Sequence, residues 1–139
     1  MESLKQTRTN DLPPAPLARA EAVLVDPSAL VGTWVSTNRE TRGIIKLILS
    51  SRNGLLTVRI FGSFPDAPYD WGEVEGAAFA DGVSLRTGVG FKAFYDFGFM
   101  ETMLAAYLNK RILVLDSYNI FKDRSPRFNY FFRDHFYQE

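Results

Sequence analysis

The feature that most constrains this chain is an alternation of apolar and polar side chains that begins near Val31 and recurs toward the C-terminus. In segment 55–62, for example, Leu56, Val58 and Ile60 are separated by polar residues. A period of two places alternate side chains on opposite faces of a β-strand. We therefore predict that the chain from residue 31 onward is built from strands rather than helices.

Short turn signals separate these segments, so consecutive strands are expected to form antiparallel hairpins. Asn53-Gly54 and Asp81-Gly82 are the residue pairs that adopt the left-handed conformations of tight hairpins. A sheet of this kind avoids exposed edges best by closing on itself. The prediction is an all-β fold, an eight-stranded antiparallel up-and-down barrel. The expected strands cover residues 31–37, 43–50, 55–62, 73–80, 89–97, 99–108, 112–121 and 127–137.

The segment before the barrel differs in composition. Residues 1–15 are polar and then proline-rich, and we expect a disordered leader. Residues 16–30 are predicted to form a short helix, with Pro16 at its start, followed by a turn over Asp26–Leu30. The barrel domain is then expected over residues 31–139.

Charge and cysteine content exclude several classes of partner and cofactor. Lys and Arg together number 16, as do Asp and Glu, and this balance disfavours nucleic acid as a partner. The chain has no cysteine and one histidine, so we expect no metal site and no cofactor. No window approaches the roughly 20 apolar residues of a membrane-spanning helix. Residues 1–25 lack the apolar core of a signal peptide, so we expect a cytoplasmic location.

Eight strands enclose an interior that either fills with side chains or holds one small ligand. Gly76, Ala78 and Ala80 are small residues on one face of a predicted strand, and they would leave room inside. Segments 43–50 and 127–137, however, are apolar on both faces. Something is therefore expected to cover part of the outer wall, either the N-terminal helix or a second subunit in a homodimer. A purely structural module with a filled interior remains an alternative.

The stretch Leu30-Val31-Gly32-Thr33-Trp34 resembles the Gly-x-Trp opening of the calycins, the lipocalin-like and avidin-like barrels. The resemblance implies that Trp34 packs across a closed barrel end and that an arginine of the last strand stacks on it. Arg133 matches this position best and Arg127 second. The second lipocalin signature and the usual disulfide are missing, and two tryptophans do not make the aromatic box of biotin binders.

A wider set of short motifs is similar to that of small uncharacterised bacterial barrels, a similarity that implies no activity. The set comprises Gly-Thr-Trp, residues 41–44, Asp70-Trp71-Gly72 and Glu101-Thr102.

The leading functional hypothesis is that the barrel binds a small hydrophobic or aromatic molecule. Aromatic abundance, 14% of the chain, and the resemblance to calycins both favour it. Tyr69 and Trp71 are expected to gate the mouth because they fall in the longest predicted connection, residues 64–72. The other expected ligand-binding residues are Trp34, Phe91, Tyr95, Met103, Tyr118, Tyr130 and Phe132.

The alternative is a small barrel enzyme, a cyclase or isomerase that folds a flexible substrate into a reactive shape, for example in secondary metabolism. Its catalytic residues would be Glu101, Asp116 and Tyr118. Glu101 lies in a strand that is apolar on both sides, and burial would raise its pKa and suit it to proton transfer. Asp116 and Tyr118 lie two residues apart and could polarise a carbonyl. Each role requires that the side chain face the interior, and an outward position is the competing interpretation.

Overall fold

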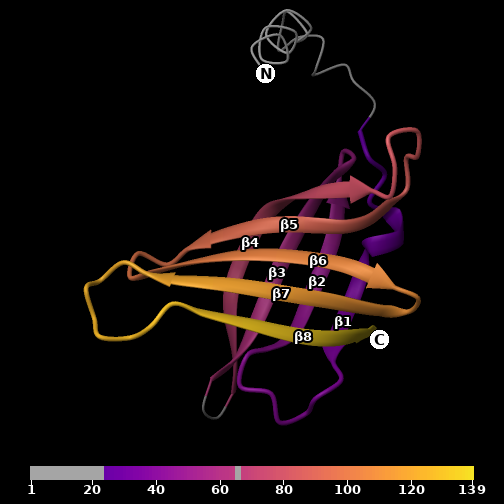
Figure 1. Ribbon diagram of the computed structural model, residues 1–139. Helices are drawn as coiled ribbons and strands as arrows, with labels where there is room; N and C mark the ends of the chain where they lie inside the picture. Colours follow the sequence, from indigo (N-terminus) through magenta and orange to yellow (C-terminus); the bar gives the residue numbers. More distant parts are fainter. Residues whose placement is uncertain (1–23, 65–66) are drawn as a thin grey trace, which may run out of the picture.

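The computed structural model describes residues 24–64 and 67–139. In this part of the chain a 3-10 turn, η1 (Ser28–Leu30), precedes eight strands that follow one another up and down the barrel (Figure 1). The strands are β1 (Gly32–Ser36), β2 (Ile44–Arg52), β3 (Leu55–Phe64), β4 (Ala67–Ala80), β5 (Gly88–Asp96), β6 (Met100–Asn109), β7 (Ile112–Phe121) and β8 (Tyr130–Gln138).

The barrel closes where β8 pairs with β1. Ser36 lies opposite Phe136, and the two strands are antiparallel like the other neighbouring strands. The predicted fold class and strand order are therefore confirmed. The Asn53-Gly54 turn between β2 and β3 adopts positive φ at both residues, 54° and 81°, as a tight hairpin requires. The turn predicted at Asp26–Leu30 is also present, since Asp26 Oδ1 accepts a hydrogen bond of 3.0 Å from the Ser28 amide.

Two predicted boundaries were wrong by three residues or more. The connection expected over residues 64–72 is instead a hairpin, because β4 begins at Ala67, which pairs with Phe64. The prolines there suggested a loop, but Pro68 lies within β4, because the fixed φ of proline is compatible with extended backbone. Strand β8 begins at Tyr130 rather than at residue 127. The Arg127 guanidinium instead lies 4.3 Å from the ring centroid of Phe121, within the loop before β8.

The predicted leader and the helix over residues 16–23 lie outside the described residues. Both stay predictions.

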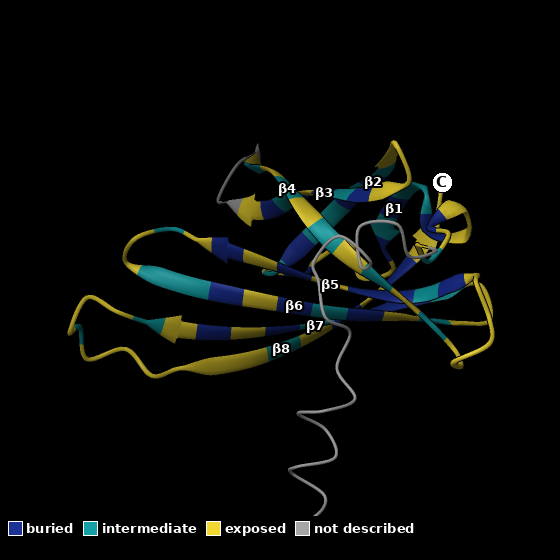
Figure 2. Cartoon of the chain, turned by 90° about the horizontal axis from the view of Figure 1, so that it is seen from above, coloured by how far each residue is buried: buried dark blue, intermediate teal, exposed yellow. Residues whose placement is uncertain are grey.

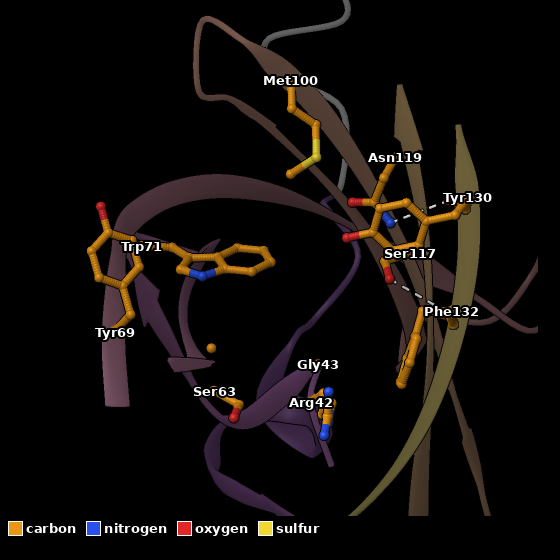
Figure 3. A pocket seen from close by; sticks show the side chains of 11 residues that line it. Arg42, Gly43, Ser63, Tyr69, Trp71, Met100, Ser117, Asn119, Tyr130 and Phe132 are labelled. Carbon is orange, nitrogen blue, oxygen red and sulfur yellow. Dashed lines mark hydrogen bonds between the residues drawn. The ribbon is translucent and has the colours of Figure 1, made fainter. Parts of the chain in front are cut away.

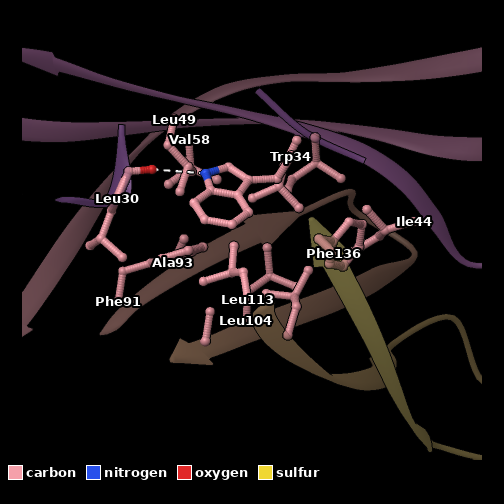
Figure 4. Packing of buried hydrophobic residues seen from close by; sticks show 14 of the residues in the cluster. Leu30, Trp34, Ile44, Leu49, Val58, Phe91, Ala93, Leu104, Leu113 and Phe136 are labelled. Carbon is pink, nitrogen blue, oxygen red and sulfur yellow. Dashed lines mark hydrogen bonds between the residues drawn. The ribbon is translucent and has the colours of Figure 1, made fainter. Parts of the chain in front are cut away.

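One end of the barrel is filled by its own side chains. Trp34 is 2% exposed, and its indole Nε1 donates a 2.9 Å hydrogen bond to the carbonyl oxygen of Leu30 in η1. This bond fixes η1 across the barrel end, beneath which the apolar core lies (Figure 4). Its members include Leu47, Leu49, Leu56, Val58, Phe91, Ala93, Leu104, Leu113 and Phe136.

The cation expected over Trp34 is not there. Arg133 Nε lies 2.6 Å from Asp116 Oδ1, and its guanidinium lies over the Phe131 ring. In the β1–β8 ladder Trp34 lies opposite Gln138. The assignments of Arg133 and Arg127 to the indole were therefore wrong: position 133 faces outward, and Arg127 lies in the loop beside Phe121.

Trp34→Ala should lower the free energy of unfolding by about 3–5 kcal/mol, because it leaves a cavity at the packed end and removes the donor that holds η1. Phe128→Ala is a matched control, since Phe128 is 87% exposed, and it should change stability by less than about 0.5 kcal/mol. Urea unfolding followed by circular dichroism measures both values. Similar losses in the two variants would contradict the role given to Trp34.

Candidate functional site

The opposite end of the barrel holds a pocket of about 530 Å³. It lies where β2, β4, β6 and β8 begin and where β3 and β7 end, so the wall of the barrel surrounds it (Figure 3). Apolar and aromatic groups form most of the lining, with a few polar side chains among them. The lining residues are Arg42, Gly43, Gly62, Ser63, Tyr69, Trp71, Met100, Ser117, Asn119, Tyr130 and Phe132.

Trp71 forms one wall of the pocket because of a β-bulge. Ile60 pairs with Gly72 and Phe61 pairs with Asp70, so Trp71 is the extra residue between them. Its indole points into the pocket (Figure 3) and passes directly over Gly62, where an added Cβ would lie 2.7 Å from Nε1. Only glycine at position 62 permits this approach. The bulge therefore turns into the barrel a side chain that the alternation of the strand would not place there.

Tyr95 fixes the bulge from the barrel interior. Its hydroxyl lies 2.7 Å from the carbonyl oxygen of Gly72 and 3.2 Å from that of Val58, both acceptors. Burial raises the pKa of the phenol well above its ordinary value, so the hydroxyl stays a donor at physiological pH. The Tyr95 ring also meets the Trp71 ring edge to face, with centroids 5.4 Å apart. Trp71 is thus held in place before any ligand arrives.

The facing wall carries the buried polar groups. Asn119, 4% exposed, accepts a 2.7 Å hydrogen bond from the Thr102 hydroxyl through Oδ1 and donates one of 3.3 Å to the carbonyl oxygen of Tyr130 through Nδ2. Ser117 Oγ donates a long bond of 3.4 Å to the carbonyl oxygen of Phe132. An amide has two N–H donors, and these bonds use one. The wall can therefore donate a hydrogen bond to a ligand from Asn119, and Ser117 can exchange its weak bond for a better one.

Asp134 lies beside this wall and joins β8 to the loop before β2. Thr41 Oγ1 donates to its Oδ1 at 3.2 Å and the Ile44 amide donates to its Oδ2 at 3.4 Å. Strand β1 ends at Ser36, so these side-chain bonds connect the wall where no β1 ladder runs. Burial is the main influence on Asp134 and raises the pKa of its carboxyl above the ordinary value; the two hydrogen bonds oppose that rise.

The structure brings together some of the residues expected to bind a ligand and separates others. Tyr69, Trp71, Tyr130 and Phe132 line the same pocket, although Tyr69 and Trp71 lie on strand β4 and not on a loop. Three others belong to the core of the barrel. These are Trp34, Phe91 and Tyr95.

Met103 and Tyr118 face outward, 42% and 43% exposed. The other residues considered for catalysis also lie on the outer wall. Asp116 forms a bidentate pair with Arg133, and Glu101 Oε2 lies 3.2 Å from Lys122 Nζ. The condition for a catalytic role, an inward side chain, is therefore not met for Glu101, Asp116 or Tyr118.

Sequence reasoning missed several lining residues, and one signal could have found three of them. The β6–β7 hairpin has a two-residue turn at Lys110-Arg111, which sets Leu108 opposite Leu113. Alternation from that pair places Met100 on β6 and Ser117 and Asn119 on β7 inside the barrel. Nothing comparable marks the other four, because they lie at a loop or close to a register shift. These are Arg42, Gly43, Gly62 and Ser63.

Comparisons of the chain with protein-family models, with curated proteins and with solved structures give no match. Within residues 24–64 and 67–139, no three His, Asp or Glu side chains cluster as a metal site would require. Across the same residues, no helix has the length and apolarity needed to cross a membrane. The geometry of the pocket is therefore the basis on which a function can be assigned.

The raised pKa of Asp134 predicts a pH dependence of stability. The folded protein holds a proton that the unfolded chain releases near the ordinary pKa of 3.8. The free energy of unfolding should therefore fall as the pH rises from that value through the raised folded pKa, and then level off. Asp134→Asn cannot titrate, so subtracting its urea-unfolding profile from that of the wild type should leave this fall.

A second variant tests the sign. The Thr41 hydroxyl stabilises the charged form of Asp134, so Thr41→Val should extend the fall to higher pH. A wild-type profile that matches that of Asp134→Asn throughout would contradict the assignment.

Proposed function

We propose that this protein binds a small, largely apolar or aromatic molecule in the pocket at the open end of its barrel. The observation that carries the proposal is a pocket of about 530 Å³ lined by Trp71, Tyr130 and Phe132. Ligand pockets typically measure about 300–1,000 Å³ and combine apolar walls with a few polar groups that orient the ligand. We also propose that the protein has a calycin-like fold, which the closed barrel and the Gly-Thr-Trp opening both support.

The polar wall narrows the class of ligand. Asn119 has an N–H donor to spare, and the Ser117 hydroxyl makes only a long bond. A ligand with an aromatic body that packs against Trp71 and a hydrogen-bond acceptor directed at β7 would satisfy both walls. Leaving such a buried donor unpaired costs about 1–3 kcal/mol, so purely hydrocarbon ligands should bind less tightly than analogues that carry a carbonyl or hydroxyl group.

The two other hypotheses receive less support. The enzyme hypothesis needs an acid or base that lines the pocket, whereas Glu101 and Asp116 form ion pairs on the outer wall. The buried carboxyl of Asp134 accepts hydrogen bonds from Thr41 and the Ile44 amide and is not part of the pocket lining. The filled-barrel hypothesis fits the end around Trp34 but not the end around Trp71, where the pocket lies. Binding at one end of a half-filled barrel is therefore the function we propose.

Titration with N-phenylnaphthylamine, a neutral aromatic dye, tests binding. We expect saturable enhancement of dye fluorescence at one dye per chain. In Trp34→Phe, Trp71 is the single tryptophan, and its emission should change with dye occupancy. In Trp71→Phe, the emission of the buried Trp34 should not change when the dye binds. A change in the emission of Trp71 without a change in that of Trp34 would place the bound dye at the open end of the barrel.

A blocking variant provides the second arm. Ser117 faces the pocket, so Ser117→Phe should fill it and weaken dye binding at least about tenfold, equivalent to about 1.4 kcal/mol. Ser84→Phe makes the same chemical change in the exposed β4–β5 connection and should bind as the wild type does. Equal binding by the two variants, or no saturable binding by the wild type to this dye and a panel of aromatic carbonyl compounds, would overturn the proposal.

A further inference from the structure

The outer wall of β5–β8 carries a row of large apolar side chains. Phe94 pairs with Met103, Met103 with Tyr118, and Tyr118 with Phe131, so the row crosses four neighbouring strands. Each of the four is between 42% and 52% exposed. Figure 2 shows exposed and buried residues alternating along β6 and β7, as expected for a wall whose two faces point to opposite sides. The row thus lies on the surface of the barrel.

Two more exposed apolar side chains lie on the same outer face, one on each side of the row. Tyr107 lies on β6 and Ile120 on β7, 46% and 48% exposed, and both have the outward parity of Met103 and Tyr118. We call the six residues the outer patch: Phe94, Met103, Tyr107, Tyr118, Ile120 and Phe131. Figure 1 shows β5–β8 side by side on one side of the barrel, so these residues belong to one continuous sheet face.

The apolar area of the outer patch is what a dimer interface needs. An aromatic side chain presents about 200 Å², so four at half exposure, with Met103 and Ile120, give roughly 550 Å². Homodimer interfaces are about 65% apolar, and an apolar centre of that size therefore corresponds to roughly 850 Å² per partner. Specific interfaces bury about 800 Å² per partner. The apolar area of the outer patch is therefore close to what a dimer interface of ordinary size requires, and in a monomer this area would stay in contact with water.

The charges within the patch favour a second copy of the chain over a lipid surface. Asp116 and Arg133 form a bidentate ion pair between the apolar residues, so these two charges can be buried together. Lys92 is exposed in the same rung, opposite Ala105, at the β5 edge of the outer patch, where its long side chain can keep the ammonium in water. Membrane surfaces select faces with clusters of Lys and Arg, whereas β5–β8 contain Lys92 alone besides the paired Arg133. The chain as a whole has a formal net charge of zero, so two copies approach without net repulsion.

We propose that the outer patch is the interface of a homodimer in which the β5–β8 face of one chain packs against the same face of another. A two-fold arrangement places the same patch on both sides, so apolar surface meets apolar surface without a dedicated partner. The mouth pocket lies inside the barrel and the outer patch outside it, so this proposal does not rest on the proposed function. Phe94, Tyr118 and Phe131 then become buried on assembly.

Sedimentation velocity of the full chain over a wide concentration range tests the proposal. We expect a reversible dimer. Met103→Lys should raise the dimer dissociation constant at least about tenfold, because it places an unpaired cation in the centre of the interface. Val83→Lys is the matched control: Val83 is fully exposed in the β4–β5 connection, and its variant should dimerise as the wild type does. Met103→Leu should also keep the dimer.

Several outcomes would overturn the proposal. The first is a wild type that stays monomeric at the highest soluble concentration. The second is a Met103→Lys variant that dimerises like Val83→Lys. The third is a monomer that binds vesicles of phosphatidylcholine and phosphatidylserine and loses that binding in Met103→Lys, which would assign the patch to a lipid surface. Near-ultraviolet circular dichroism and dye binding check that Met103→Lys is folded; if it is not, Phe131→Lys replaces it.

Discussion

The closure of β8 onto β1 is the constraint on which the rest of this structure depends. Closure removes both sheet edges and gives the sheet an inside and an outside, so the position of a side chain in the alternation of its strand decides on which of the two it lies. The interior is divided unequally as a result. Trp34 and η1 fill one end with apolar side chains, while the bulge at Trp71 and the small residues at Gly43 and Gly62 leave the other end hollow.

Much of the fold follows from the sequence, because the alternation and the turn residues are local signals. The Asn53-Gly54 hairpin and the pairing order needed no distant information. The interior face of β6–β8 was harder to predict, since Met103, Tyr118 and Phe131 make the outer face as apolar as the inner one. Patterns of hydrophobicity identify the buried face only when the other face is polar, and a second apolar surface removes that difference.

The site was predictable in part for a related reason. Tyr69 and Trp71 were predicted at the mouth because they are aromatic residues in the longest expected connection. Tyr130 and Phe132 were predicted to line the barrel because they are aromatic residues of the last expected strand, and all four line the pocket. The polar residues Ser117 and Asn119 were missed because an isolated serine or asparagine in a strand signals nothing by itself. Asp134 was missed for another reason. Its role depends on Thr41 and the Ile44 amide, about ninety positions away, and no local pattern reports such a contact.

The short β1 has a consequence for how the barrel wall is held together. Beyond Ser36 the neighbour of β8 is a loop, and the wall there is held by the carboxyl of Asp134 rather than by a continuous backbone ladder. Side-chain bonds of this kind separate without disrupting a strand pair. Cohesion along the seam between β8 and the 37–43 loop therefore depends on the two bonds of Asp134 and on one backbone bond, from the Thr37 amide to the carbonyl oxygen of His135.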